Sequence, residues 1–438
     1  MEVEKVKSIM VDAIVLGRGP LGIYTSLVLI EKGYKVLNVD AGKQLKNLKS
    51  SLKVNSNIEW KTKVEAPSLN INGSNFHWGG GCMGWPLEDL ESDYPEFGFD
   101  EKNFIKSNNR IVKYLEIDDF DFLKNHPNSF YEDDFINTTI GDIRYTYLLK
   151  DIKFEKIISV LESNKNYEFK DGVIAKKISE IDDKLTIDFY LKKRNEYFQI
   201  KTEKLFICLG GVENSRILQN SENTLNLSKH HLLRNLNDHL RLNIGEIEVN
   251  DINRFKKIFD KKKNFVGEKH LWPRYILHSK SNKSYSYFKD WRYNNLFIRR
   301  FTSQNFKNNI KTSGTCNLYL FVEKVNSKNT FIELENNINP DSFKVNFYLD
   351  RNEITKINKI INSYAENLIE DFVEYNLRFK KVKYLKTEKD ISKVISSNHP
   401  SGTTPMGKVS TNSIVNHKSQ LWENNDIYIF GSSTFTRP

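Results

Sequence analysis

The stretch V-D-A-I-V-L-G-R-G-P-L-G-I-Y-T-S-L-V-L-I-E-K-G-Y-K-V-L-N-V-D-A-G, residues Val11 to Gly42, decides the fold. Its apolar run Ala13–Leu16 predicts a buried strand, and the periodicity of Ile23–Lys32 predicts a helix. A second predicted strand, Tyr34–Val39, ends at the acid Asp40. This order of strand, glycine turn, helix, strand and acid predicts a dinucleotide-binding βαβ unit.

The glycines of this unit, Gly17, Gly19 and Gly22, have G-x-G-x-x-G spacing. The first allows a tight turn, the second lets the backbone approach a pyrophosphate, and the third lets the helix pack close to the strand. The helix N-terminus offers N–H groups to the phosphates. Asp40 would accept hydrogen bonds from an adenosine ribose and disfavours NADP, while FAD and NAD both remain open. The cofactor-binding residues expected here are Gly17, Gly19, Pro20, Leu21, Gly22, Asp40, Ala41 and Gly42.

Composition places this unit in an ordinary globular protein of two or three domains. The 438 residues include 28 Phe and 20 Tyr, too many aromatics for a disordered chain. The net charge is +10, but the lysines are interleaved with acids and no nucleic-acid module is legible, so nucleic acid is not expected as a partner. Three dispersed cysteines argue against disulfides and zinc ribbons and favour the cytoplasm. No signal peptide and no transmembrane run is recognisable.

A second glycine-rich segment, N-G-S-N-F-H-W-G-G-G-C-M-G-W-P, covers Asn72–Pro86. Such a density of glycine is poor for a helix or strand and predicts a loop. The glycines would let the backbone approach a flat ligand, and the tryptophans could wall it. The cofactor-binding residues expected in this loop are Asn75, His77, Trp78, Gly79 and Gly80.

Four further segments complete a recognisable order. Lys204–Leu209 is a predicted strand that G-G and a short helix, Val212–Ser221, follow. R-N-L-N-D-H-L ends at Leu240, H-P-S-G-T-T-P-M-G begins at His399, and I-Y-I-F-G-S-S-T-F ends at Phe435. Together with G-R-G-P-L-G and G-S-N-F-H-W-G-G-G, they resemble the glucose–methanol–choline (GMC) oxidoreductases, FAD-dependent enzymes that oxidise alcohols and sugars.

The resemblance implies FAD as the cofactor and an α/β fold. A Rossmann-like FAD-binding domain would be built from discontinuous segments, with an inserted α+β substrate domain that combines a mixed or antiparallel sheet with helices. We expect FAD-binding parts at residues 1–92, 141–245 and 391–438, a cap or substrate-side segment at 93–140, and the substrate domain at 246–390. The resemblance also assigns Val173 to the adenine site and Gly210, Gly431 and Ser432 to cofactor binding.

His399 is the position that matches the proton acceptor of the family. Flavin-dependent oxidation of a CH–OH group removes a proton from the hydroxyl and a hydride from the carbon, and the hydride goes to flavin N5. Imidazole suits this task because its ordinary pKa of about 6.5 leaves it neutral at cytosolic pH. We expect no metal at His399, since no second His, Cys or acid lies at ligand spacing in the sequence.

Two other histidines have less definite roles. His77 would pack on the flavin edge, although some sugar-oxidising relatives attach the flavin covalently at a similar H-W pair. His239, in N-D-H, is interpreted as a structural turn residue. The expected substrate is a sugar or polyol-like alcohol. Its identity, the electron acceptor, and the choice between oxidase and dehydrogenase stay open.

The sequence departs from the family at its C-terminal end. The family continues past this turn into an N-P-T-like stretch with a second catalytic residue, Asn or His, and a closing helix, whereas this sequence ends at Pro438. We therefore expect a truncated chain whose last strand, Ile427–Phe430, exposes apolar surface. The alternatives to truncation are a partner that completes the site and a degenerate member of the family. For the function, the alternatives are a catalytically impaired or inactive flavin-binding member and another FAD or NAD Rossmann oxidoreductase.

Overall fold

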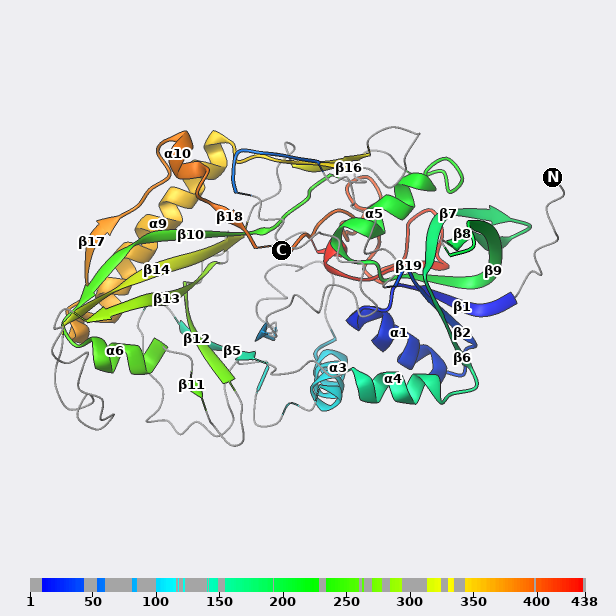
Figure 1. Ribbon diagram of the computed structural model, residues 1–438, viewed down its shortest axis with the longest axis horizontal. Coiled ribbons are helices and arrows are strands. Elements are labelled where there is room, and N and C mark those ends of the chain that lie inside the picture. Colours follow the sequence, from blue (N-terminus) through cyan, green and yellow to red (C-terminus); the bar gives the residue numbers. More distant parts are fainter. Residues whose placement is uncertain are drawn as a thin grey trace.

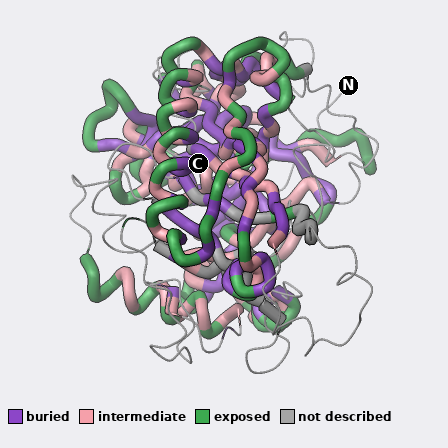
Figure 2. The backbone as a smooth tube through the Cα atoms, turned by 90° about the vertical axis from the view of Figure 1, so that its left-hand side faces the viewer, coloured by how far each residue is buried: buried purple, intermediate pink, exposed green. Residues whose placement is uncertain are grey.

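A computed structural model describes most of the chain, and Figure 1 shows two lobes built on two sheets. The described residues are 10–42, 53–59, 81–84, 100–115, 117, 121–122, 140, 142–148, 154–191, 193–227, 234–259, 262–263, 270–277, 284–293, 313–323, 330–334, 343–397 and 399–435. Figure 2 shows buried backbone running through the interior, with exposed segments at the edges. No helix among these residues has both the length and the apolar character needed to cross a membrane.

The first sheet contains the predicted βαβ unit. Its strands lie in the order β6-β2-β1-β9-β8-β7, and β19 pairs with β9. Strands β6, β2, β1, β9 and β19 are parallel neighbours, whereas β7, β8 and β9 form an antiparallel meander. The bounds are β1 Met10–Leu16, β2 Val36–Asp40, β6 Tyr167–Asp171, β7 Val173–Ile181, β8 Lys184–Leu191, β9 Glu196–Ile207 and β19 Ile427–Ile429.

Helices α1 (Pro20–Glu31), α4 (Glu155–Glu162) and α5 (Gly210–Asn220) accompany this sheet. Because the strands of the parallel part are covered by helices, they read as continuous apolar runs, and Ala13–Leu16 is almost completely buried. This agrees with the predicted Rossmann-like arrangement, in which residues 10–40, 167–207 and 427–429 contribute strands to one sheet.

The strand β19 is buried, contrary to the expectation of an apolar surface at the last strand. Ile427 and Ile429 are fully buried. On the other face the ring of Tyr428 stacks on Phe206, with ring centroids 4.8 Å apart. The expectation was wrong because β9 and the loop before β19 supply the cover that a helix was thought necessary to provide.

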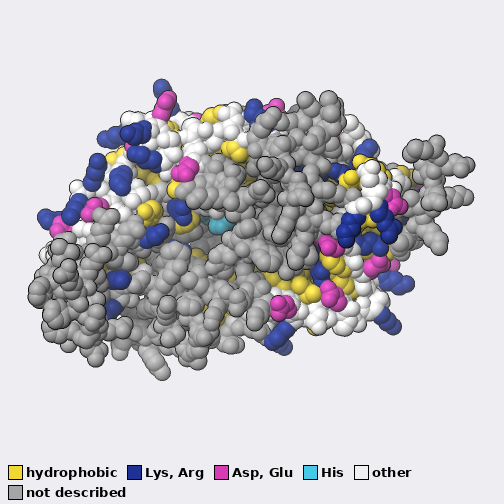
Figure 3. Space-filling view, in the orientation of Figure 1, with side chains coloured by type: hydrophobic (Ala, Val, Ile, Leu, Met, Phe, Trp, Pro, Cys, Tyr) yellow, Lys and Arg dark blue, Asp and Glu magenta, His cyan; other side chains and the backbone are white. Residues whose placement is uncertain are grey.

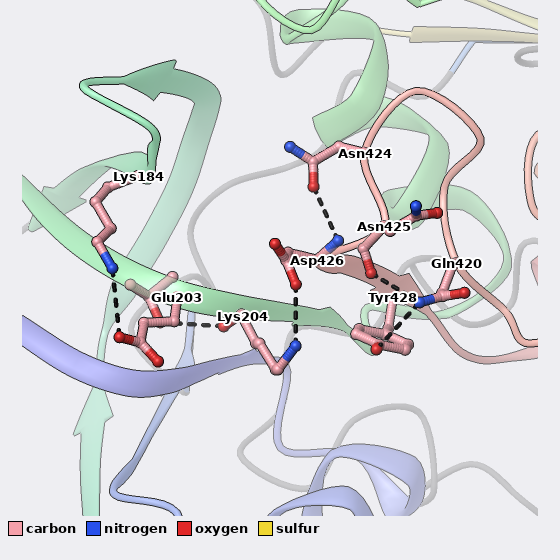
Figure 4. A network of polar contacts seen from close by, with 9 residues as sticks. Lys184, Glu203, Lys204, Gln420, Asn424, Asn425, Asp426 and Tyr428 are labelled. Carbon is pink, nitrogen blue, oxygen red and sulfur yellow. Dashed lines mark hydrogen bonds and ion pairs between the residues drawn. The ribbon is translucent and has the colours of Figure 1, made fainter.

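Polar contacts fix that loop to the edge of the first sheet (Figure 4). Lys204 pairs with Asp426 across 2.9 Å, and the Gln420 amide donates to the Asn425 carbonyl oxygen (2.9 Å) and to the Tyr428 hydroxyl (3.2 Å). Such exposed contacts contribute little stability each, but they set the register of the short strand.

The second lobe is an antiparallel sheet in the order β17-β10-β14-β13-β12-β5-β4. Helix α9 (Arg351–Asp371) lies along it (Figure 1). The strand bounds are β4 Gly81–Cys82, β5 Asp142–Leu148, β10 His239–Val249, β12 His270–Leu277, β13 Ser284–Tyr293, β14 Gly314–Glu323 and β17 Arg378–Val382; β11 (Lys262–Lys263) pairs with β12, and β18 (Ile395–Ser396) with β10.

The two faces of this sheet differ in burial. Leu240 and Leu242 of β10, with Leu318, Leu320 and Val322 of β14, are buried in one core with Ile361 and Leu368 of α9. The intervening residues of both strands are only half-buried. Alternation of this kind is typical of a sheet with one face packed on the core. We call the packed side the α9 face.

The remaining described elements are a small sheet and several helices. Strands β15 (Phe331–Leu334), β16 (Phe343–Phe347) and β3 (Lys53–Ser56) form the small sheet, in that order. The other helices are α3 (Glu101–Tyr114), α6 (Ile252–Phe259) and α10 (Glu388–Ile391), with 3₁₀ turns at Val373–Tyr375 and Ser432–Thr434. The predicted domain boundaries remain a prediction; strand β5, at residues 142–148, pairs with β12 of the second sheet.

Helix α9 begins earlier than its apolar pattern predicts. Periodicity predicts a helix over Ile354–Phe372, and the observed helix begins three residues earlier. Its start is set by a capping box, in which Asp350 accepts from the Glu353 backbone and the Glu353 side chain accepts from the Asp350 backbone. An N-cap fixes the first residue of a helix through hydrogen bonds, so it leaves no trace in the apolar pattern.

Candidate active site

The glycine turn between β1 and α1 has the geometry of a phosphate cradle. Gly17 has φ +97°, a backbone conformation that side chains disfavour. A Cβ on Gly22 would lie 1.9 Å from the Gly17 carbonyl oxygen, so the helix can approach the strand only with glycine there. A Cβ on Gly19 would meet nothing within 4 Å. The turn is therefore tightly packed on the protein side and open at Gly19.

The N-terminus of α1 supplies donors at that opening. Its cap residue Gly19 has no side chain to accept from the first N–H groups, and the first turn contains no acid. Leu21, in this first turn, leaves 45% of its surface exposed. Free N–H groups and the positive end of the helix dipole fit a diphosphate, which would occupy the open side of Gly19.

Asp40 ends β2 and faces the same turn. Its carboxylate accepts from the backbone N–H groups of Arg18 (2.7 Å) and Gly42 (2.8 Å). Burial raises the pKa of Asp40 to about 6, and these two N–H groups act in the opposite direction. A buried carboxylate that accepts only backbone donors can accept further hydrogen bonds, as a ribose diol would offer. This geometry suits a ribose acceptor, and that role of Asp40 stays a prediction.

Val173 lies near the same end of the sheet. The last residue of β6, Asp171, is the register partner of Asp40, and Val173 begins the next strand. The packing is close here, since a Cβ on Gly42 would lie 1.6 Å from the Asp171 carboxylate. The structure thus brings Asp40, Gly42 and Val173 to one edge of the first sheet, where the sequence prediction placed adenosine.

Three segments far apart in the sequence meet beside the glycine turn. A Cβ on Gly431 would lie 3.7 Å from the Leu21 side chain and 3.9 Å from the Cα atom of Gly210. The Asn214 side chain donates to the Phe430 carbonyl oxygen (3.0 Å) and to the Ser433 hydroxyl (2.8 Å), which joins α5 to the turn after β19. The predicted cofactor-binding residues Leu21, Gly210 and Gly431 are therefore neighbours.

The loop that carries His399 packs against this junction. Ser432, another predicted cofactor-binding residue, donates its hydroxyl to the Pro400 carbonyl oxygen (2.8 Å). The Thr403 hydroxyl donates to the Gly211 carbonyl oxygen (2.5 Å). Ser401 and Asn237 exchange two backbone hydrogen bonds of 3.0 Å. The loop is held from three sides, and His399 itself remains exposed at its end.

Asp238 is a candidate site residue that the sequence prediction missed. Its buried carboxylate accepts from the backbone N–H of His399 (3.0 Å) and from the Ser396 hydroxyl (2.5 Å). Burial raises the pKa of Asp238, while the hydrogen bond from Ser396 and the proximity of His399 act to lower it. The N-D-H motif drew attention to this segment. Its contact with His399 could not be predicted, because the two residues lie 161 positions apart in the sequence.

His239, which the sequence interpretation took as a structural turn residue, begins a strand and lies beside His399. The two imidazole rings are edge-on at 88°, with centroids 5.6 Å apart. Burial and, second, the neighbouring His399 lower the pKa of His239 to about 3, so its imidazole is neutral at ordinary pH. His239 is also the first residue of β10, so it joins the candidate base to the second sheet.

The expectation of no metal at His399 stays a prediction, although the fold brings possible ligands together that sequence spacing does not reveal. Ligand atoms of Asp238, His239 and His399 lie within 4.8 Å of one another, close enough to hold an ion. The Asp238 oxygens, however, already accept from Ser396 and from the His399 backbone. We therefore assign the cluster to holding the histidine loop.

The predicted cofactor-binding residues that the structure describes are successive neighbours. Asp40 contacts the glycine turn, the turn adjoins Gly431, and Ser432 contacts the loop of His399. Asn75, His77, Trp78, Gly79 and Gly80 lie outside the described residues, so their predicted roles stay predictions. On the face drawn in Figure 3, a histidine side chain is visible near the middle, with basic side chains to its left.

Comparison with known proteins supports this arrangement. The sequence model described as GMC oxidoreductase matches residues 327–438. Among solved structures, the chain is similar to pyridoxine 4-oxidase from Mesorbium loti, with TM-score 0.62 and 12% identity over 98% of this chain and 95% of that one. The comparison with curated proteins gives no match. The family match covers the C-terminal region, which carries His399 and the Gly431 turn, so this part of the chain is similar to the GMC oxidoreductases.

Proposed function

We propose that the protein is an FAD-dependent oxidoreductase that oxidises a CH–OH group of a sugar or polyol-like alcohol, with His399 as the proton acceptor. The observation that carries this proposal is the junction of the glycine turn, Gly431, Ser432 and the His399 loop. At this junction the exposed imidazole of His399 belongs to a loop that contacts the predicted dinucleotide-binding residue Ser432. Bound FAD would supply the hydride acceptor.

The residues of the chain handle the proton and the position of the substrate. As the C=O bond forms, the hydroxyl proton of the alcohol passes to an imidazole nitrogen of His399, within hydrogen-bond reach of the oxygen. The imidazolium that results is stabilised by the buried carboxylate of Asp238, which also accepts from the His399 backbone. The neutral ring of His239 limits the orientations that His399 can adopt.

The test combines the visible spectrum with a substitution of the base. We expect the purified protein to be yellow and its flavin absorbance to be bleached anaerobically by an oxidisable sugar or polyol. The His399→Ala variant should keep the flavin and lose reduction rate by about 10²- to 10⁴-fold, the usual contribution of a general base. Oxygen and an artificial acceptor are supplied in separate turnover assays, because pyridoxine 4-oxidase has the same fold and is an oxidase.

His417 offers a matched control. It lies in a loop at residues 415–419, apart from the cluster of Asp238, His239 and His399. The His417→Ala variant should reduce its flavin at the wild-type rate. A yellow protein that no alcohol bleaches would indicate a flavin-binding protein without this activity, and a colourless protein would contradict the proposal at its first step.

A further inference from the structure

The face of the second sheet opposite the α9 face carries the polar groups nearest to the candidate base. On β10 its residues are His239, Arg241 and Asn243, and on β14 they are Asn317, Tyr319 and Phe321. All six are half-buried, whereas Leu240, Leu242, Leu318 and Leu320 between them are buried. We call this set the His239 face. Its first residue contacts His399 ring to ring, so the face begins at the candidate base.

Arg241 is the cation of this set closest to His239. The two residues are separated by one position on the strand, which sets their Cα atoms ~7 Å apart on the same face. In the register Arg241 lies opposite Phe321 of β14 and opposite Ile395 of β18. The Arg241 guanidinium can therefore contact one group of a substrate while His399 contacts a hydroxyl several ångströms away on the same molecule.

The Arg241 guanidinium has no partner among the residues that the structure describes. Among the described residues it forms no hydrogen bond, ion pair or cation–π contact, although other arginines of the chain do. Its direct partners in the sheet are a phenylalanine and an isoleucine. A half-buried guanidinium between apolar residues has lost part of its hydration, and a carboxylate or a phosphate, each of which offers two acceptor oxygens, restores hydrogen bonding to two of its N–H groups.

We propose that Arg241 binds an anionic group of the substrate, so that the site takes an alcohol bearing a carboxylate or a phosphate. This deepens the proposed function and rests on it. The hydroxyl to be oxidised would lie at His399 and the anion further along the His239 face. Asn243, Asn317 and Tyr319 lie beyond Arg241 on that face.

The experiment uses the purified full-length protein and three sugars on one scaffold: glucose, glucuronate and glucose 6-phosphate. We expect kcat/KM to be higher for at least one anionic sugar than for glucose. Arg241→Gln should lower kcat/KM for that sugar by about 10- to 100-fold, the usual worth of a charge-assisted hydrogen bond. The value for glucose should change less than twofold. Arg241→Lys should keep part of the preference, and the better of the two anions identifies carboxylate or phosphate.

Arg254→Gln is the matched control, since Arg254 lies on α6 at the surface, where it pairs with Glu374. This variant should keep the preference for the anionic sugar. Equal losses for anionic and neutral sugars in Arg241→Gln, or no preference in the wild type, would overturn the proposal.

A binding measurement separates this result from a failure of the proposed function. In the His399→Ala variant, thermal shift with glucose 6-phosphate or glucuronate reports binding without turnover. A shift that Arg241→Gln abolishes supports the anion site even if no alcohol is oxidised. Absence of any shift, in a protein whose wild type oxidises neutral alcohols, contradicts the anion site and leaves the oxidoreductase in place.

Discussion

At the scale of single residues, we predict that Asp40 makes FAD binding depend on pH. In the free protein its pKa is raised to about 6, chiefly by burial. A ribose that donates hydrogen bonds favours the carboxylate, so binding lowers this pKa and releases a proton. Affinity for FAD should therefore be constant above pH 6 and fall as pH drops through the free-state value, by up to about tenfold per pH unit.

Fluorescence titration of FAD between pH 5 and 8 measures this dependence. Asp40→Asn should bind FAD more weakly at pH 7 and lose the dependence below pH 6. Asp12→Asn is the control, because Asp12 accepts from the Lys35 backbone N–H (2.8 Å) at an exposed site on the same sheet. An Asp40→Asn variant with the wild-type pH profile would exclude Asp40 as the ribose acceptor.

A second residue-scale prediction concerns the charge of Asp238. Asn is nearly isosteric with Asp, and its amide can still hydrogen-bond both the His399 backbone and the Ser396 hydroxyl. Asp238→Asn should therefore keep the fold and the flavin while it removes the negative charge beside His399. We expect the reduction rate to fall on the order of tenfold, which corresponds to a partly screened charge interaction.

The readouts are stopped-flow reduction and the FAD dissociation constant. Ser396→Ala removes one hydrogen bond and leaves the charge, so it should slow reduction less than Asp238→Asn does. Equal effects of the two substitutions would show that Asp238 acts only through its hydrogen bonds.

At the scale of elements, we predict that the glycines of the β1–α1 turn have different roles: Gly22 is needed for packing, whereas Gly19 is needed for cofactor binding. Gly22→Ala places a Cβ 1.9 Å from the Gly17 oxygen, so the helix must move from the strand and thermal stability should fall sharply. Gly19→Ala meets no atom within 4 Å, and Gly19 has φ −71°, which alanine adopts readily. The apo protein should melt as the wild type does.

Gly19→Ala should nevertheless bind FAD at least about tenfold more weakly, because its methyl group would occupy the side left open for the pyrophosphate. Differential scanning fluorimetry without FAD, together with FAD titration, distinguishes the two effects. Unchanged affinity in Gly19→Ala would show that the cofactor phosphates lie elsewhere.

At the scale of the whole molecule, the net charge of +10 acts on any anionic substrate. A positive surface raises the encounter rate of anions, and salt screens this attraction over ~8 to 10 Å at 0.1–0.15 M ionic strength. For an anionic sugar kcat/KM should therefore fall as NaCl rises from 20 to 500 mM, while the value for glucose stays constant. Arg241→Gln, with net charge +9, should keep most of this salt dependence although its affinity for the anion is lower. Parallel salt curves for glucose and the anionic sugar would contradict steering by the whole charge.

The fold itself leaves much of the chemistry open, because one fold supports many substrates. The similarity to pyridoxine 4-oxidase at 12% identity concerns the arrangement of the chain. Substrate selection depends on side chains such as Arg241 on the His239 face, which is why the experiments compare sugars that differ only in charge.

The sequence alone determined the features whose physical causes are local. The run of apolar residues, the glycine spacing and Asp40 specify β1, α1 and β2 because a buried strand, a tight turn and a helix need those residue types at those positions. The order of the motifs likewise predicted the GMC resemblance, which the family match at residues 327–438 supports, and the role of His399, which stays a prediction. Helix α9 was predicted, but not its first residue, since a cap depends on hydrogen bonds rather than on periodicity.

Only the tertiary structure decided which residues surround His399. Asp238 and Ser396 contact each other across 158 positions, and His239 reaches His399 from the start of another strand. The register of β10 against β14 and β18 decided that Arg241 shares a face with His239. Such pairings arise because burial of apolar surface, which has no direction along the chain, packs distant segments together and leaves their polar neighbours side by side.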